Sequence, residues 1–326
     1  MVSEPLLRVD GLHVEFASKS RTVEVLRDVN FDVAAGETIC IVGESGSGKS
    51  MTALATLGLI PHPGRITKGR ILLDGQDLAG LSRKTMQATR GARISMIFQE
   101  PMNSLNPVLT ITSQIAEVLR RHAGLSHRQA SVRVVDLLRA VGIPAPEERA
   151  RAYPHQMSGG MRQRVMIAMA IACRPRLLIA DEPTTALDVT VQKQILRLLK
   201  SIQRESEMAL VLITHDMGIV SEMGDRVVVM YAGQPVEIGT VSEVLSRPRH
   251  PYTQALIKCA PRMSREVGER ERLPEILGTV PALDRLPVGC TFAPRCAQSI
   301  ETCQLRRPRQ TDIGGTRVAC WVAEGS

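Results

Sequence analysis

A glycine-rich octapeptide, GESGSGKS at residues 43–50, constrains this chain more than any other feature. It follows an apolar run at residues 39–42 and precedes residues 51–57, whose composition favours a helix. A strand, a glycine loop and a helix in this order are the context of a phosphate-binding P-loop. Glycines let consecutive backbone N–H groups converge on phosphate oxygens, and the helix N-terminus adds positive potential. The sequence therefore predicts binding of a nucleoside triphosphate.

Residues of the octapeptide have separate tasks in such a loop. Lys49 can reach the β- and γ-phosphates, and the Ser50 hydroxyl can bind Mg²⁺. The competing interpretation is a chance glycine-rich turn, and the flanking strand and helix argue against it. The other nucleotide contacts that we predict are Gly43, Ser45, Gly46, Ser47, Gly48 and Met51.

Composition limits the class of protein. The chain has 326 residues, of which 44% are hydrophobic and 23% charged, as in a globular protein with a substantial core. Aromatic residues make up only 2%, and the net charge of +8 is dispersed, so we expect no nucleic-acid partner. No apolar run approaches the ~20 residues that cross a bilayer, and the start lacks a signal-peptide pattern. We therefore expect a cytosolic protein whose membrane role needs a partner.

Hydrophobic periodicity divides the chain into regions. Residues 5–33 alternate apolar and polar side chains, which predicts antiparallel strands. Residues 110–174 have helical spacing, which predicts a helical insertion in an α/β core. Apolar runs then predict buried parallel strands at residues 176–181, 208–214 and 226–233.

Polar residues at the ends of apolar strands complete a candidate catalytic site. Beside a P-loop strand, Asp181 can join the Mg²⁺ shell and Glu182 can polarise the water that attacks the γ-phosphate. Gln99 can contact Mg²⁺ or that water, and His215 can hydrogen-bond the γ-phosphate. Each residue alone also fits a cap or a solvated strand end. The P-loop upstream favours the catalytic interpretation.

A Ser-Gly-Gly turn at Ser158, Gly159 and Gly160 opens a long apolar helix. Ser158 is a favourable N-cap, so the helix N-terminus is a second potential anion site. One chain has no evident need of two γ-phosphate sites. Two chains packed head to tail do, since each turn can close over the other chain's nucleotide. The sequence therefore predicts a dimer in which this turn serves the partner's site.

The order of these motifs resembles that of ABC-transporter ATPase subunits over about residues 5–240, including an Ala-Leu-Asp loop that ends at Asp188. The resemblance implies an α/β fold: a RecA-like P-loop ABC ATPase core with an antiparallel β subdomain and an inserted helical subdomain at about residues 100–174. It also implies that two ATP molecules are sandwiched in a dimer, with Asp188 in a loop at the dimer interface. ATP hydrolysis would then be coupled to movement of separate membrane subunits.

Further segments resemble the dipeptide, oligopeptide and nickel permease ATPases, among them residues 98–107, 153–175 and 248–256. This likeness implies an ATPase domain at residues 1–240 and a small cysteine-rich extension at residues 241–326. It implies import of di- or oligopeptides from the cytoplasmic face of the inner membrane. The implied partners are a sister ATPase chain, two transmembrane permease subunits and, indirectly, an extracytoplasmic substrate-binding protein. A soluble ABC ATPase not coupled to transport and an importer of another cargo, such as nickel, are the alternatives.

The chain departs from the family pattern in two places. Met161 stands where the signature turn usually has glutamine, so we expect weakened rather than lost function. No aromatic residue stands upstream of the P-loop where one normally stacks on adenine. Val23 and Val25 occupy that region, and Phe16 is a poorly placed substitute.

Four of the seven cysteines lie in the C-terminal extension, at Cys290, Cys296, Cys303 and Cys320. In a reducing cytosol such a group indicates metal or cofactor ligation rather than disulfides. Four thiolates suffice for zinc or for an iron–sulfur cluster. Structural zinc usually has close cysteine pairs, whereas wide spacing suits a larger cluster. The family resemblance also implies a [4Fe–4S] cluster; zinc and simply packed thiols remain the alternatives.

Overall fold

The computed structural model describes residues 4–17, 21–99, 104–185, 187–259 and 275–324. These residues form two compact units that alternate along the chain. The first unit comprises the chain up to Leu7, Val33–Glu37 and Leu73–Leu212. The second unit comprises Arg8–Asp32, Thr38–Leu72 and the chain from Ile213 onward. Residues 100–103, part of the segment 98–107, and Ala186, the first residue of the Ala-Leu-Asp loop, lie outside the described residues.

Parallel strands form the centre of the first unit. All five residues of β7 are buried, and β6 pairs parallel to β7 with Ile97 opposite Ala180. Buried parallel pairing of this kind is what the apolar runs predict. The residues that follow β6 and β7 therefore leave the sheet at the same edge. The strands of this unit are β5 (Gln76–Asp77), β6 (Ile94–Ile97), β7 (Leu177–Asp181) and β8 (Ala209–Thr214). Only the part of β8 up to Leu212 belongs to this unit.

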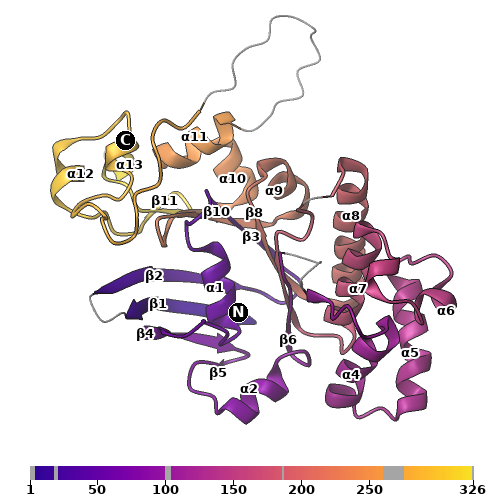
Figure 1. The fold of residues 1–326 in the computed structure, drawn as a ribbon. Helices are drawn as coiled ribbons and strands as arrows, with labels where there is room; N and C mark the ends of the chain where they lie inside the picture. Colours follow the sequence, from indigo (N-terminus) through magenta and orange to yellow (C-terminus); the bar gives the residue numbers. More distant parts are fainter. Residues whose placement is uncertain (1–3, 18–20, 100–103, 186, 260–274, 325–326) are drawn as a thin grey trace, which may run out of the picture. The chain divides into compact units, whose positions relative to one another are not determined.

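The predicted helical insertion is present in the first unit, where α4 packs on α5 and α7 (Figure 1). Local sequence sets its ends: a capping box joins Ser126 to Gln129 at the start of α5, and Gly124 ends α4 at a φ of +65°. The helices of this unit are α2 (Arg83–Thr89), α4 (Ile111–Ala123), α5 (His127–Ala140), α6 (Pro146–Arg149), the 3₁₀ turn η1 (Pro154–Gln156), α7 (Gly159–Ile171) and α8 (Val189–Ser206).

A second set of strands builds the other unit. In one sheet the order is β2-β1-β4; in the other it is β11-β12-β10-β9-β3. β3 and β9 are parallel, with Val42 opposite Val229. The strands are β1 (Leu7–Ala17), β2 (Thr22–Val33), β3 (Thr38–Val42), β4 (Gly64–Leu73), β9 (Arg226–Tyr231), β10 (Gln234–Thr240), β11 (Thr311–Ile313) and β12 (Thr316–Val318).

The cysteine-rich extension continues the sheet of the second unit. β12 pairs antiparallel to β10, with Val318 opposite Glu237, and β11 pairs with β12. Because β12 shares backbone hydrogen bonds with β10, the extension is fixed to the body of this unit. The helices of the unit are α1 (Lys49–Thr56), α9 (Met217–Met223), α10 (Val241–Ser246), α11 (Pro251–Cys259), the 3₁₀ turn η2 (Ala293–Arg295), α12 (Glu301–Leu305) and α13 (Trp321–Glu324).

Aromatic side chains from distant segments meet in the second unit. The ring of Tyr231, at the end of β9, lies 4.7 Å from that of Tyr252 and 5.2 Å from that of Phe292, between centroids. Edge-to-face contacts at these separations stabilise a core beyond simple burial. This aromatic cluster joins β9, α11 and the segment before η2. Within the described part of the chain, no helix is long and apolar enough to cross a membrane.

Candidate nucleotide site

The glycine loop connects β3 to α1, as the sequence predicts. A Cβ on Gly43 would overlap the carbonyl oxygen of Met230, and the φ of Gly43 is +152°. Gly48 precedes α1 at a φ of +100°, and a Cβ there would lie 2.7 Å from the Leu26 Cδ2. A side chain at Gly43 would require a shift of the backbone, and one at Gly48 would displace the Leu26 side chain and strain a left-handed backbone conformation. Packing against β2 and β9 thus fixes the two ends of the loop.

Lys49 folds back over the loop that precedes it. Its side chain is buried, and the Nζ atom donates to the carbonyl oxygens of Gly43 at 2.8 Å and Glu44 at 3.0 Å. Ser47 is also buried, and its Oγ has no hydrogen-bond partner among the described residues. Buried polar groups without partners are rare and call for a ligand or water. The loop therefore offers a cation and an unsatisfied hydroxyl at the place where phosphates are predicted. The other predicted contacts lie beside them: Ser45 and Gly46 are exposed in the loop, and Ser50 and Met51 are half-buried in the first turn of α1.

The first unit brings Gln99, Asp181 and Glu182 to one edge of its sheet. Asp181 is the buried last residue of β7. Glu182 follows at a φ of +44°, a backbone region that L-residues rarely adopt and that often marks functional sites. Its Oε2 accepts from Gln99 Nε2 at 3.1 Å and from Thr185 Oγ1 at 2.9 Å. The glutamate carboxylate is thus oriented by two donors.

Thr185 is the residue of this group that sequence reasoning missed. Its hydroxyl donates to Glu182 from three positions further along the chain. The signal was present, since a threonine three residues after a strand-ending glutamate can reach back in a tight turn. The amide of Thr185 also donates to the carbonyl of Glu182 at 3.1 Å, which confirms such a turn.

The Ser-Gly-Gly turn lies in the first unit at the start of α7. Ser158 caps the helix, accepting from the Met161 amide at 3.3 Å, and both Ser158 and Gly159 are exposed. A Cβ on Gly160 would lie 2.9 Å from Val191 Cγ1, so the first turns of α7 and α8 are in close contact. Asp188 caps α8 by accepting from the Val191 amide at 2.9 Å. The signature turn and the Asp188 loop are therefore neighbours.

The remaining predicted residues belong to the second unit. His215 follows β8 and is exposed. Val23 and Val25 are half-buried in β2. A Cβ on Gly64 would lie 2.6 Å from the Phe16 Cζ, so the Phe16 ring packs on β4. Whether Phe16 stacks on adenine stays a prediction.

The four cysteines of the extension share one region. Cys290, Cys303 and Cys320 are buried and Cys296 is half-buried. The Cys290 amide donates to the Cys303 carbonyl at 2.8 Å. Burial raises the pKa of the Cys290 thiol to about 11, and the neighbouring thiols of Cys303 and Cys320 contribute to the rise. Among the described residues, however, no group of three or more His, Cys, Asp or Glu side chains is arranged to hold a metal ion. The thiols are neighbours without forming a preorganised single-ion site.

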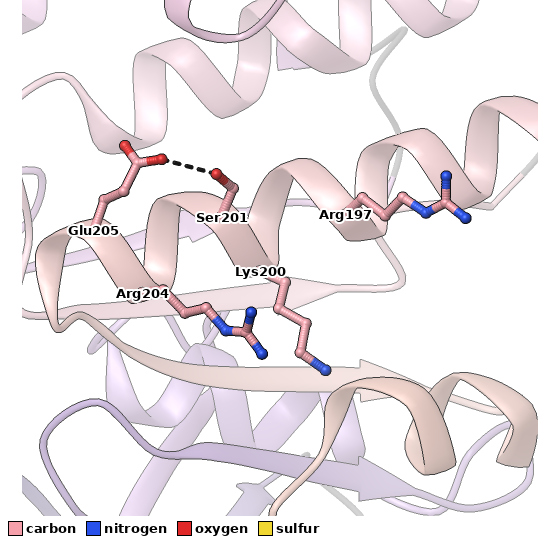
Figure 2. A pocket seen from close by; sticks show the side chains of 5 residues that line it. All are labelled: Arg197, Lys200, Ser201, Arg204 and Glu205. Atoms are coloured by element: carbon pink, nitrogen blue, oxygen red, sulfur yellow. Dashed lines mark hydrogen bonds between the residues drawn. The ribbon is translucent and has the colours of Figure 1, made fainter.

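A hollow of about 420 Å³ lies on α8 (Figure 2). Ser201 Oγ within it donates to Glu205 Oε1 at 2.8 Å. None of the predicted site residues lines it, so it is separate from the groups described above. Its lining residues are Arg197, Lys200, Ser201, Arg204 and Glu205.

Comparisons with known proteins agree with this assembly of motifs. The family model "ABC transporter" matches residues 26–185, and "Oligopeptide/dipeptide transporter, C-terminal region" matches residues 236–303. The dipeptide transport ATP-binding protein DppD of Bacillus subtilis (strain 168) is 49% identical over 98% of this chain and 96% of its own. DppD of Escherichia coli (strain K12) is 49% identical over 93% of this chain and 92% of its own.

A solved structure supports the fold. The ATP-binding cassette MJ0796, in a dimeric post-hydrolysis state bound to ADP and Pi, superposes with a TM-score of 0.65. It is 27% identical and covers 72% of this chain and 98% of its own. Motif order, site geometry and near-full-length identity agree: this chain belongs to the ABC transporter family, among the ATP-binding proteins whose chains carry an oligopeptide/dipeptide transporter C-terminal region.

Proposed function

We propose that this chain is the ATP-hydrolysing motor of an importer that moves di- or oligopeptides through separate membrane permease subunits. The observation that carries the ATPase assignment is the Glu182 carboxylate, which Gln99 and Thr185 hold beside Asp181. A carboxylate oriented by two donors can act as the general base towards an attacking water. The peptide cargo is supported by the near-full-length similarity to two dipeptide transport ATP-binding proteins.

The glycine loop binds the triphosphate in this proposal. Backbone N–H groups at residues 43–48, the Ser47 hydroxyl and the Lys49 ammonium neutralise and orient the phosphates. Mg²⁺, when bound, would neutralise charge on the phosphate oxygens, and Ser50, Gln99 and Asp181 would hold it. Glu182 takes the proton of the attacking water. His215 hydrogen-bonds the γ-phosphate.

Dimer formation completes each site. Ser158, Gly159 and Gly160 present an exposed, serine-capped helix start to the partner chain's nucleotide, and Asp188 lies in the adjoining loop. Because Met161 stands where glutamine is usual, this surface lacks one side-chain amide. The partner is a homologous sister subunit, and the pair lies peripherally on the cytoplasmic face of the membrane under two permease subunits. Peptide reaches the permease from an extracytoplasmic substrate-binding protein.

The experiment for this function is recovery of the assembled complex. Affinity capture of the chain from a detergent extract of its native cells should yield two hydrophobic permease subunits and a second ATPase chain. The complex should hydrolyse ATP faster when peptide-loaded binding protein is added. Capture of a purely soluble complex contradicts the transport role and favours an ABC ATPase not coupled to transport.

We also propose a division of the chain into an ATPase domain at residues 1–240 and an extension at residues 241–326. The division is supported by the start of the second family match at residue 236. It is also supported by the start of α10 at Val241, directly after β10. Limited proteolysis tests it: cleavage between residues 240 and 275 should leave an N-terminal fragment that still binds ATP, although more weakly than the full-length chain.

We propose further that Cys290, Cys296, Cys303 and Cys320 bind a [4Fe–4S] cluster. The proposal is supported by their shared neighbourhood, in which Cys290 and Cys296 each lie close enough to Cys303 and Cys320 to interact electrostatically. The cluster would tie these four positions together. Anaerobic purification should give brown protein with about four irons per chain. Colourless protein with one zinc would assign the site to zinc, and metal-free protein would leave packed thiols.

A further inference from the structure

A residue of the glycine loop is held by the C-terminal extension. Arg295, in η2, donates from Nη1 to Glu44 Oε2 at 2.7 Å and from Nη2 to Glu44 Oε1 at 3.0 Å. The two residues are 251 positions apart in the chain. A two-pronged contact between guanidinium and carboxylate fixes both position and orientation. Glu44 is the second residue of the octapeptide, directly after Gly43.

Arg295 is itself held in place. Its side chain is 4% exposed, and its guanidinium lies 5.8 Å from the Tyr231 ring centroid and 6.0 Å from that of Phe292. Its Nε donates to the Leu277 carbonyl at 3.0 Å. These contacts fix the guanidinium within the extension, so it can transmit the position of the extension to the loop.

A second contact from the C-terminal region holds the backbone of the same residue. The Glu44 amide donates to the Tyr252 hydroxyl at 2.9 Å. Tyr252 lies in α11, is fully buried and packs on Tyr231. Its hydroxyl oxygen accepts this bond, and burial raises the pKa of its phenol. The Glu44 carbonyl meanwhile accepts from Lys49 Nζ.

Glu44 is thus fixed through its amide, its carbonyl and its carboxylate, and two of these three anchors come from α11 and η2. The loop leaves β3 at this point, so the direction of the following phosphate-binding amides depends on it. If the anchors are lost, the loop spends less time in its binding conformation. The apparent affinity is then the intrinsic affinity multiplied by the fraction of chains in the binding conformation.

We propose that Arg295 and Tyr252 are positioning residues of the nucleotide site, through which the C-terminal extension sets the affinity of the glycine loop for ATP. The proposal rests on the ATPase function above. It assigns the extension a task in nucleotide binding. Arg295 lies in the segment between Cys290 and Cys296, so the conformation of that segment determines the position of its guanidinium.

The test is an equilibrium titration that measures the dissociation constant of ATP with the full-length chain. Arg295→Met and Glu44→Gln should each raise this dissociation constant about tenfold, within the usual range of coupling between sites. The double variant should match the single variants, because both remove the same contact. Arg309→Met, an exposed arginine of the same extension, is the control and should leave affinity unchanged.

A merely structural role predicts a different pattern. It would lower the urea midpoint of unfolding while leaving the dissociation constant at its original value, and that result overturns the proposal. Additive effects of the two substitutions also overturn it. If Arg295→Met does not fold, Arg295→Lys is measured instead, since lysine keeps the positive charge but cannot make the two-pronged contact with Glu44. Its dissociation constant for ATP should lie between those of the unmodified chain and of Glu44→Gln. An unmodified chain that does not bind ATP overturns the proposed function as well.

Discussion

The side-chain amide of Gln99 donates to the carboxylate of Glu182 across 3.1 Å, joining the ends of two parallel strands. The contact follows from the register, because Ile97 of β6 stands opposite Ala180 of β7. Each residue then lies two positions beyond this pair. In the proposed function Gln99 contacts Mg²⁺ or the attacking water, so this bond would link occupancy of the nucleotide site to the orientation of Glu182.

Replacing Glu182 by glutamine tests the base directly. Glu182→Gln keeps size and hydrogen bonding but cannot accept the proton from water. Phosphate release should fall on the order of 10²–10⁴-fold, with ATP affinity retained and the closed dimer accumulating. Glu205→Gln on α8 is the matched control and should hydrolyse normally. Undiminished turnover by Glu182→Gln would remove Glu182 from the role of base.

Lys49→Ala tests the glycine loop. The ammonium of Lys49 is buried against two loop carbonyls, and its loss would remove the cation that we propose neutralises the phosphates. ATP binding should fall by at least tenfold in equilibrium titration. Lys258→Ala, an exposed lysine of α11, should bind as the unmodified chain does. Unchanged ATP affinity in Lys49→Ala would contradict the assigned role.

Gly43→Ala tests the packing of the loop on β9. A Cβ there overlaps the Met230 carbonyl, and the backbone conformation is itself unfavourable for alanine. The substitution should lower the free energy of unfolding by about 1–3 kcal/mol and weaken ATP binding. Urea unfolding and nucleotide titration measure the two effects. Gly80→Ala, where a Cβ meets nothing within 4 Å and φ is ordinary, should change neither.

His250 predicts a loss of stability in acid. Complete burial lowers its pKa from 6.5 to about 3 in the folded chain. The unfolded state therefore binds the proton first as pH falls below 6.5, and stability falls with it. At pH 5.5 the loss is about 1.4 kcal/mol, one pKa unit below the unfolded value.

Comparison with His250→Asn isolates this effect. The His250 Nδ1 accepts from the Tyr252 amide at 3.0 Å, and an asparagine oxygen can take over that bond. Burial raises the pKa of the adjacent Glu237, which acts in the opposite direction in both proteins. The difference in urea midpoint between the two proteins should shift in favour of His250→Asn between pH 7.5 and 5.5. A difference that does not depend on pH would contradict the assignment.

Local patterns in the sequence were sufficient for much of the fold and of the motifs. The glycine loop sits between a strand and a helix, and most of residues 110–174 are helical, because backbone geometry and hydrophobic period determine both. The sequence placed Gln99 and Glu182 at the ends of two strands near a P-loop, but it did not show that their side chains are in contact. That contact depends on the register of β6 and β7, which only the structure shows.

The contacts that lie far apart in sequence could not be predicted. No local pattern indicates that Arg295 reaches Glu44 or that β12 extends the sheet at β10. These pairings depend on the path of the whole second unit. Sequence spacing likewise placed four thiols in one extension without showing that they are neighbours but not arranged for a single ion.

Peptide uptake by the complete complex in proteoliposomes tests the central claim most directly. With ATP supplied on the side of the ATPase subunits and peptide-loaded binding protein on the other, labelled dipeptide should accumulate. A complex carrying Glu182→Gln should assemble and bind ATP yet accumulate none. Equal uptake by the two complexes would show that this chain does not power transport.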